Sequence, residues 1–286
     1  MRAVSVDHYE NFPVASLLCP PHLRAAVRAI YRYARTADDL ADEGDAAPEE
    51  RLQDLAAYRR DLDAVVAGQV PSARWPEVFD PLSHVLREHR LPPAPLHTLL
   101  DAFAQDVVRA PYADRDDLLD YCRRSANPIG RLMLHLYGVD DAHSLAQSDA
   151  ICTALQLVNF WQDLSVDTAR GRLYAPLADC RRAGVSPEAL LARQDGPAVR
   201  ALLAALVAWS RELMAAGAPL ALRLPGRVGF ELRLVVQGGL RILDKIERHG
   251  FDMRRRPTLG VLDAPLLLLR ALAMPRIVPR LGKAGA

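Results

Sequence analysis

Residues Asn159–Tyr174 read NFWQDLSVDTARGRLY and carry two aspartates four residues apart, Asp163 and Asp167. On an α-helix this spacing places both carboxylates on one face, one turn apart. Two like charges stacked in this way are mildly destabilising unless a hard cation lies between them. Mg²⁺ prefers oxygen ligands and usually takes one or two carboxylates together with substrate phosphates. The segment therefore predicts a helix that holds Mg²⁺ and a phosphorylated substrate.

The same spacing occurs much earlier, in YRYARTADDLADE, where Asp38 and Asp42 form a second pair. A single pair of this kind is commonly a solvated helix face. Here both pairs come late in apolar, aromatic helical segments, where unpaired carboxylates are costly to bury. Two such sites together favour metal binding. If the two faces oppose each other, they can hold a diphosphate through bridging Mg²⁺ ions.

Four stretches of the chain carry a family resemblance. They are ENFPVASLLCPPHLRAAVRAIYRYARTADDLADE near the start, the central YCRRSANPIGRLMLHLYG, the second aspartate segment, and the late GLRILDKIERHGFDMRRRP. In this order they resemble the squalene/phytoene synthase family of head-to-head isoprenoid synthases over nearly the whole chain. Within that family, ENFPVAS, RRSANPIG and NFWQD are most similar to the bacterial hydroxysqualene synthases of the hopanoid pathway.

The hydrophobic pattern predicts an all-α fold in a single domain, residues 1–286. Apolar residues recur at helical spacing, and no segment shows the alternation that is typical of a strand. The predicted helices cover about residues 22–41, 49–66, 75–88, 96–108, from 116 onward, 129–137, 146–166, 187–193, 197–216, 227–248 and 265–274. The resemblance implies that these helices form a prenyl-synthase bundle around a central cavity.

Composition excludes some classes of function. The chain has 286 residues, 50% of them hydrophobic and 25% charged, and a formal net charge of +1. This balance does not suggest a nucleic-acid binder. The four cysteines form no CxxC pair and are expected to be reduced thiols in a cytoplasmic protein. The first residues lack the apolar core of a signal peptide.

The longest apolar run is APLLLLRALAM, Ala264–Met274, interrupted by Arg270. It is shorter than the 18 or so residues of a membrane-spanning helix. A last core helix is the preferred interpretation. The alternative is an interfacial anchor at the inner face of the membrane, where Arg270, Arg276 and Arg280 would meet anionic lipid. Contact with neighbouring enzymes of the pathway is a further expectation for partners.

The resemblance implies a basic site for the diphosphate of the substrate. Arg35 lies three residues before Asp38, within one helical turn of the first metal face, and matches an arginine that the family uses on diphosphate. Arg172 and Tyr174 follow the second pair, in a segment that resembles a flap over the diphosphate. Arg256, just before a proline, resembles another diphosphate contact.

Other positions are expected to line the same site. Asn11 and Phe12 stand where relatives have a Ser-Phe pair near the diphosphate. Gln156 and Asn159 precede Asp163 by seven and four residues, so helical geometry places them on its stripe. Their alternative is an ordinary role as buried amides.

Two charged residues, Asp39 and Arg170, lie close to the aspartate pairs in the sequence. Asp39 lies about 100° around the helix from the first pair. It is expected to support the metal site or, equally, to be solvated or salt-bridged. Arg170 is expected at the surface.

Tyr121 matches the tyrosine of the family's Tyr-Cys segment, which the resemblance places near the reacting carbons. Its ring could stabilise a carbocation, although a buried tyrosine is commonly an ordinary core residue. Ser125 and Asn127 follow it where many relatives have valine and glycine. Our hypothesis is that Asn127, helped by Ser125 or Tyr121, positions an attacking water. The alternative is that Asn127 caps the helix that begins at Pro128.

Two further departures bear on the reaction. Gln162 occupies a substrate-site position where relatives often carry arginine, and Gly239 replaces a common aromatic residue, which predicts a roomier pocket. No GxGxxG follows a strand, so no nicotinamide-binding unit is expected.

The predicted reaction is the Mg²⁺-dependent conversion of presqualene diphosphate and water to hydroxysqualene and diphosphate. The alternative is head-to-head condensation of two prenyl diphosphates to presqualene diphosphate, dehydrosqualene or phytoene. A remote alternative is a non-catalytic assembly factor, but such relatives typically lose aspartates that are intact here.

Overall fold

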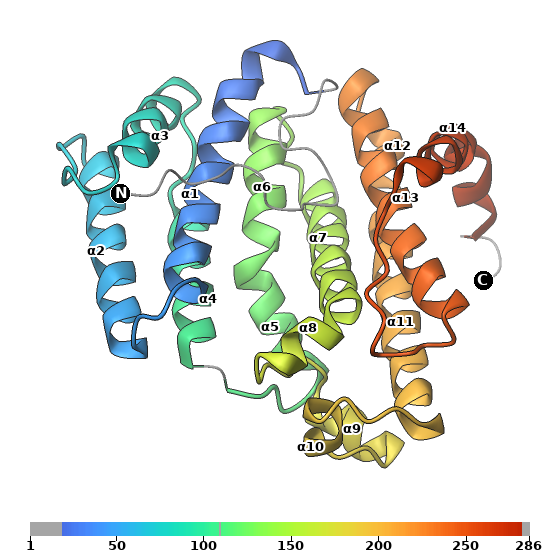
Figure 1. Cartoon of the computed structure of the whole chain (residues 1–286). Helices are drawn as coiled ribbons and strands as arrows, with labels where there is room; N and C mark the ends of the chain where they lie inside the picture. Colours follow the sequence, from blue (N-terminus) through green and yellow to red (C-terminus); the bar gives the residue numbers. More distant parts are fainter. Residues whose placement is uncertain (1–18, 109, 282–286) are drawn as a thin grey trace.

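The structure, a computed structural model, describes residues 19–108 and 110–281, with side chains as far as Met274. The helices are η1 (Pro21–Leu23), α1 (Arg24–Asp42), α2 (Pro48–Val66), α3 (Pro76–Glu88), α4 (Ala94–Val108), α5 (Arg115–Ser125), α6 (Asn127–Leu136), α7 (Ala142–Gln162), α8 (Leu164–Ala169), α9 (Leu177–Ala183), α10 (Pro187–Leu191), α11 (Pro197–Gly217), α12 (Leu220–Arg223), α13 (Gly226–Arg248), η2 (Val261–Asp263) and α14 (Ala264–Leu281). No strand occurs within the described ranges, so the all-α prediction is confirmed (Figure 1).

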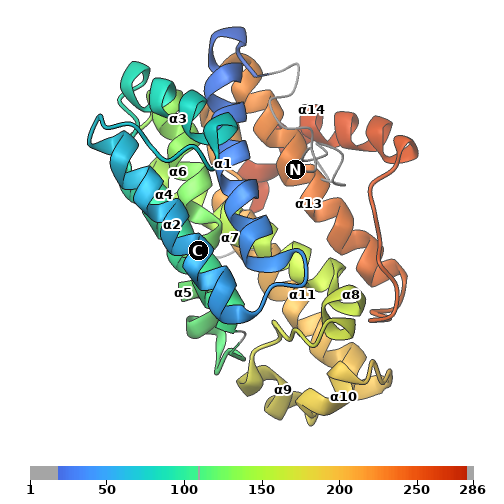
Figure 2. The same ribbon diagram turned by 60° about the vertical axis from the view of Figure 1, so that its left-hand side comes forward.

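Helices α1 to α4 form one side of the bundle around an aromatic core (Figures 1 and 2). Tyr33 of α1 is completely buried, and its ring lies 5.2 Å from that of Tyr58 in α2. The Tyr58 hydroxyl donates to the Tyr33 carbonyl at 3.0 Å, and the Tyr33 hydroxyl donates to the Leu96 carbonyl at 3.1 Å. Because both buried hydroxyls have partners, the aromatic rings fix α1 without a desolvation penalty. This core positions the end of α1, where the first aspartate pair lies.

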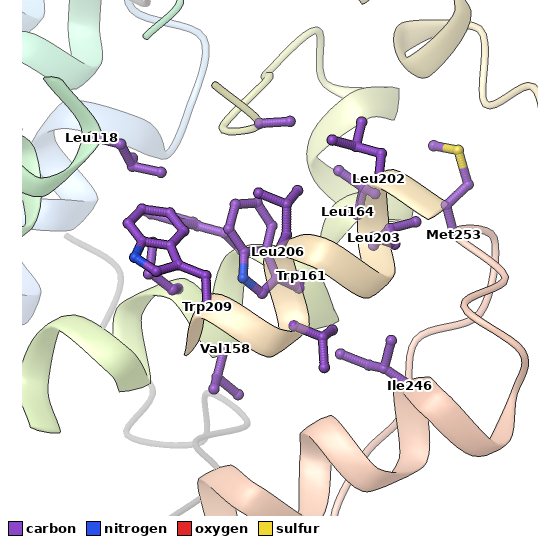
Figure 3. Packing of buried hydrophobic residues seen from close by; sticks show 14 of the residues in the cluster. Leu118, Val158, Trp161, Leu164, Leu202, Leu203, Leu206, Trp209, Ile246 and Met253 are labelled. Atoms are coloured by element: carbon purple, nitrogen blue, oxygen red, sulfur yellow. The ribbon is translucent and has the colours of Figure 1, made fainter. Parts of the chain in front are cut away.

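The second core joins α7 to α11 (Figure 3). Trp161, at the end of α7, and Trp209 of α11 lie side by side in it. The indole N–H of Trp161 donates to the hydroxyl of Ser210 at 2.8 Å, so its polar group is satisfied. Met253, from the segment after α13, lies among the leucines of α11 in the same cluster. These contacts fix the end of α7 against α11 and so position Asp163, the next residue in the chain.

Helix α7 ends at Gln162 and α8 begins at Leu164, with Asp163 between them at φ −97° and ψ 9°. The prediction of one continuous helix from 146 to 166 is therefore wrong at this point. The backbone N–H of Asp167 still donates to the carbonyl of Asp163 at 2.9 Å. The two aspartates therefore keep a spacing of one helical turn, although the axis changes between α7 and α8.

One apolar stretch, Pro197–Arg223, is long and apolar enough to cross a membrane by length and composition, and 50% of its most apolar window is buried in the fold. It comprises α11, which packs against α7, and α12. Packing inside the bundle explains its apolar character. Arg200, Arg211 and Glu212 interrupt it, so it contains no uninterrupted apolar run of spanning length. The sequence pattern does not predict helices α9 and α12.

Candidate active site

Arg35 neutralises the first aspartate segment in the structure. Its guanidinium lies 3.0 Å from the carboxylate of Asp38 and 2.8 Å from that of Asp39. The fork of an arginine suits two acceptors at once. Asp39 is therefore salt-bridged, which was one of its two expected roles. Arg35 is placed by α1 itself, because positions three and four apart lie on one face of a helix.

An ion pair between Arg172 and Asp42 joins the first aspartate pair to the loop that follows the second pair. Asp42 ends α1, whereas Arg172 follows the second pair in the loop after α8. Only 14% of the Arg172 side chain and 19% of the Asp42 side chain are exposed. Because a half-buried charge pair of this kind needs close geometry to be stable, the contact fixes the loop after α8 against α1. The loop that follows the second pair is thus linked directly to the end of α1.

Arg256 forms an ion pair with Asp163, the first aspartate of the second pair. Its guanidinium binds both carboxylate oxygens of Asp163, at 2.6 Å and 3.1 Å. The neighbouring Pro257 carbonyl accepts a hydrogen bond from the Gln162 side-chain amide at 2.8 Å. Gln162 is buried and ties the segment after α13 to the end of α7. In the structure the Gln162 side chain therefore serves to hold these two segments together.

Burial raises the pKa of Asp38 to about 6, with the neighbouring Asp39 acting in the same direction and Arg35 opposing it. Burial, followed by repulsion from Asp163, raises the pKa of Asp167 to about 7. Both shifts show that burial disfavours the charged form of these carboxylates.

The donor set fits a hard cation. Asp38, Asp42, Asp163 and Asp167 offer only carboxylate oxygens, the ligands that Mg²⁺ prefers. Within the described residues no three His, Cys, Asp or Glu side chains come close enough together to hold a metal ion by themselves.

An aromatic wall adjoins the aspartates. The rings of Phe160 and Tyr174 stack at 3.8 Å with 8° between their planes, and the Tyr121 ring lies 6.2 Å from that of Phe160. Tyr112 lies 5.5 Å from Tyr121. Burial raises the pKa of Tyr174 far above its ordinary value. Tyr174, expected in a flap, is therefore a neutral wall residue whose hydroxyl lies near acidic groups.

Asp106 is a site residue that the sequence analysis missed. The hydroxyl of Tyr121 donates to its carboxylate at 2.7 Å. Asp106 also acts to raise the pKa of Tyr112 and of Tyr174, so it lies close to both phenols. The available signal was a lone acid at the end of the apolar run in α4, AFAQDVV, where an unpaired carboxylate is costly.

Asn127 does not cap α6, so that alternative is wrong. It is the first residue of the helix, Ala126 occupies the capping position, and no side-chain cap hydrogen bond forms there. The side-chain amide oxygen of Asn127 instead accepts a hydrogen bond from the hydroxyl of Thr153 in α7 at 3.0 Å, and Asn127 is buried. The hydroxyl of Ser125 is buried and finds no hydrogen-bond partner within the described part of the chain. A buried polar atom of this kind is a natural position for an ordered water.

The remaining predicted positions differ in their surroundings. Gln156 is half-buried, whereas Asn159 is exposed and so is not a buried amide. Asn11 and Phe12 lie outside the described residues. Arg170 is exposed, as expected. The expectation of a roomier pocket at Gly239 is wrong, because a Cβ there would come within 2.9 Å of Leu155 and 3.0 Å of Met214, whose side chains already fill the space.

The sequence and the fold of this chain are similar to those of known proteins. The squalene/phytoene synthase profile matches residues 6–263. The hydroxysqualene synthase of Rhodopseudomonas palustris is 33% identical over 249 residues, 86% of this chain and 82% of that protein. The hydroxysqualene synthase of Sinorhizobium fredii is 34% identical over 274 residues, 95% and 91% of the two chains.

The crystal structure of squalene synthase HpnC from Alicyclobacillus acidocaldarius is also similar. It superposes with a TM-score of 0.78 at 36% identity, over 86% of this chain and 90% of that one. Profile, relatives and fold agree over most of the sequence. The chain therefore belongs to the squalene/phytoene synthase family, whose enzymes act on prenyl diphosphates.

Proposed function

We propose that this protein converts presqualene diphosphate and water to hydroxysqualene and diphosphate in an Mg²⁺-dependent reaction. The observation that carries the proposal is the ion pair between Arg172 and Asp42, which joins the loop after the second aspartate pair to the first pair. The similarity to hydroxysqualene synthases over most of the chain supports the choice of reaction within the family.

The first step is loss of diphosphate, which leaves with the electron pair of its C–O bond. Asp38, Asp42, Asp163 and Asp167 would hold Mg²⁺, which when bound supplies Lewis-acid neutralisation of the leaving group. Arg35, Arg172 and Arg256 would add charge-assisted hydrogen bonds to the diphosphate oxygens. In the structure each of these arginines pairs with an aspartate of the same site, so positive charge is already in place there.

The carbocation left behind needs a wall that does not react with it. Phe160, Tyr174 and Tyr121 provide aromatic faces, which stabilise a cation through the ring quadrupole. Because the hydroxyl of Tyr121 donates to Asp106, the orientation of its ring is fixed. This arrangement would keep the cation intact until its oxygen nucleophile arrives.

The cyclopropylcarbinyl cation first rearranges, and one C–C bond of the cyclopropane ring breaks to give an open-chain carbocation. The new C–O bond then forms between that carbocation and the oxygen of one water, which passes a proton to the released diphosphate. Ser125 lies four residues after Tyr121, hence on the same face of α5, and its hydroxyl has no partner within the described residues. Asn127 lies just beyond and is held by Thr153. We propose that these two side chains hold the attacking water and that other water is excluded.

The second candidate function is head-to-head condensation of two prenyl diphosphates. The observation that favours it is that Arg35 and all four aspartates are intact, since condensation also begins by ionising a diphosphate. Gln162 argues against it, because its amide is committed to Pro257 where relatives often carry a positive charge. The intact aspartates also argue against a non-catalytic assembly factor.

The test is to incubate the purified protein with Mg²⁺ and either farnesyl diphosphate or presqualene diphosphate. Products are identified by mass spectrometry. We expect hydroxysqualene to form from presqualene diphosphate and no product to form from farnesyl diphosphate. Formation of presqualene diphosphate, dehydrosqualene or phytoene from an allylic diphosphate would select the second candidate instead. We propose a cytoplasmic enzyme that meets its lipid-soluble substrate at the inner face of the membrane.

A further inference from the structure

Helix α14 carries an unusual run of exposed leucines. Leu268, Leu269 and Leu272 are 47%, 64% and 60% exposed, respectively. Their spacing places them on one face of the helix. The opposite face holds Ala271 and Met274, which are buried, and α14 packs against α13. One side of α14 is thus an ordinary core contact, whereas the other is apolar and open.

Two more apolar side chains precede α14. Val261 and Leu262 of η2 are 90% and 92% exposed. Together with Leu268, Leu269 and Leu272 they form what we call the apolar face. All five lie within twelve residues of the sequence. Large exposed apolar surfaces of soluble proteins commonly have a binding role.

The apolar face is held firmly on the protein. Asp263, which follows Leu262, is buried and accepts from Arg241 at 2.7 Å, from Lys245 at 2.5 Å and from the Gly260 N–H at 2.8 Å. Because three donors converge on one carboxylate, the turn is anchored to α13. The exposure of Val261 and Leu262 is therefore a feature of an ordered turn.

A basic pocket of about 420 Å³ adjoins this turn, and its charged lining residues are Arg241, Lys245, Arg248, His249 and Arg256. Arg256 is bound to Asp163 of the candidate active site, so the other four residues are the ones that face a second ligand. Lys245 also donates to the carbonyl of Thr258, which joins the pocket to the segment leading into η2. Nη1 of Arg241 is buried without a hydrogen-bond partner, and Arg248 is exposed and forms no ion pair with any described residue. The pocket therefore has donors to spare for an anion.

The charge of this part of the sequence points to the same kind of ligand. Residues 241–286 contain ten Lys and Arg against four Asp and Glu, a formal +6, whereas the whole chain carries +1. The positive charge of the protein is thus concentrated in this region. A second copy of the chain would bring like charges together at this surface, which disfavours self-association there.

We propose that the apolar face and the basic pocket bind a bilayer that contains anionic phospholipid. The five apolar side chains would enter the boundary between headgroups and acyl chains, and a phosphate-bearing headgroup would take the basic pocket. In both views α14 lies beyond α13, on the opposite side of the molecule from α2 and α3 (Figures 1 and 2).

The experiment measures binding of the full chain to sedimenting vesicles, without substrate or Mg²⁺. One set of vesicles is phosphatidylcholine, and the other contains one quarter phosphatidylglycerol. We expect the protein to bind the anionic vesicles preferentially and to be released as salt rises. Since no turnover is involved, this result is independent of the proposed reaction.

Two variants test the two parts of the surface. Leu268→Ser combined with Leu269→Ser and Leu272→Ser should weaken vesicle binding at least about tenfold. Arg248→Ala should weaken it roughly fivefold, and only on anionic vesicles. Both should retain wild-type helical circular dichroism, because the altered side chains are exposed.

A matched control is Val70→Ser. Val70 is 92% exposed in the connection between α2 and α3, on the opposite side of the molecule. It should bind vesicles like the wild type. The proposal is overturned if the wild type stays in solution with anionic vesicles, or if the leucine variant pellets as well as the Val70 control. Oligomeric state is measured by analytical ultracentrifugation. If the wild type is a dimer that does not bind vesicles, and the leucine variant is a monomer, the surface is an interface between two copies of the chain instead.

Discussion

Arg172, in the loop after α8, forms an ion pair with Asp42 at the end of α1. The two residues are 130 positions apart, and each lies next to one of the two aspartate pairs. The contact therefore joins the halves of the site before any ligand is considered. It also makes the loop after α8 a structural part of the first aspartate pair.

Arg172→Gln should lower kcat/KM for the diphosphate substrate by roughly 10- to 100-fold, the effect of losing one charge-assisted hydrogen bond of about 1.5–3 kcal/mol. The matched control is Arg170→Gln, two residues earlier, because the Arg170 side chain is exposed. Steady-state kinetics on both variants make the comparison. Equal losses in the two would show that the loop needs only general positive charge.

Asp38→Asn and Asp163→Asn should each reduce turnover by about three orders of magnitude or more, because each removes a ligand for the cation that neutralises the leaving group. Helical circular dichroism should be unchanged, and stimulation by Mg²⁺ should be lost. Asp101→Asn is the control, since Asp101 forms an exposed pair with Arg59 away from the aspartate segments. Wild-type rates in either site variant would contradict the metal assignment.

The sequence predicts most of this arrangement because its signals are local. Helical periodicity finds the long helices, and the spacing of Asp38 and Asp42 gives the first carboxylate face directly. The change of axis at Asp163 is invisible to periodicity, since the residues on both sides keep helical spacing. It depends on how the end of α7 packs against α11 and on the tether from Gln162 to Pro257.

Other features depend on tertiary partners. Asp106 is recognisable as a site residue only when Tyr121, 15 residues later, folds against it. Gly239 suggests an open space from the residue type, but α7 and α11 supply Leu155 and Met214 to fill it. The sequence determines these contacts too, but they emerge only when helices that are distant in the chain pack together.

Asp263 should stabilise the fold in a pH-dependent way. Burial acts to raise its pKa, but hydrogen bonds from Lys245, the Gly260 N–H and Arg241 outweigh that effect and hold the pKa well below its usual range. A carboxylate with a lowered folded-state pKa contributes stability that is present above its unfolded pKa of about 4 and is lost as pH falls toward the folded value.

The variant Asp263→Asn should therefore lower the free energy of unfolding by roughly 3–5 kcal/mol at pH 7, because it leaves two buried cations without their partner. The difference from the wild type should shrink as pH falls below about 4. Asp120→Asn, which removes solvent-accessible pairs with Arg123 and Arg124, should cost about 1 kcal/mol or less. Denaturant unfolding between pH 3 and 7 measures both. A pH-independent difference for Asp263→Asn would argue against the ionised carboxylate as its cause.

Turnover should not require reduced nicotinamide, because the sequence contains no dinucleotide-binding fingerprint and addition of water needs no hydride. Product formation is measured from presqualene diphosphate with and without NADPH. Equal yields of hydroxysqualene are expected. A strict need for NADPH, with squalene as the product, would contradict the proposed reaction.

The last prediction concerns the alcohol product. Asn127→Gly, combined with Ser125→Val if needed, should divert product from hydroxysqualene to a dehydrated or rearranged hydrocarbon. Both changes remove polar groups that would hold the attacking water, and a buried water needs roughly two to four such partners. The buried Ser125 hydroxyl, which has no partner within the described residues, is the group best placed to gain one from that water.

Thr153→Val separates positioning from contact. It removes the hydroxyl that donates to Asn127 but leaves Asn127 itself in place. If Asn127 acts on the water, this variant should give a partial shift in product ratio, smaller than that of Asn127→Gly, at a similar rate of substrate consumption. Mass spectrometry of the hydrocarbon fraction gives the ratio. If all three variants stay active and yield only hydroxysqualene, the attacking water is held by other groups and Asn127 serves only to join α6 to α7.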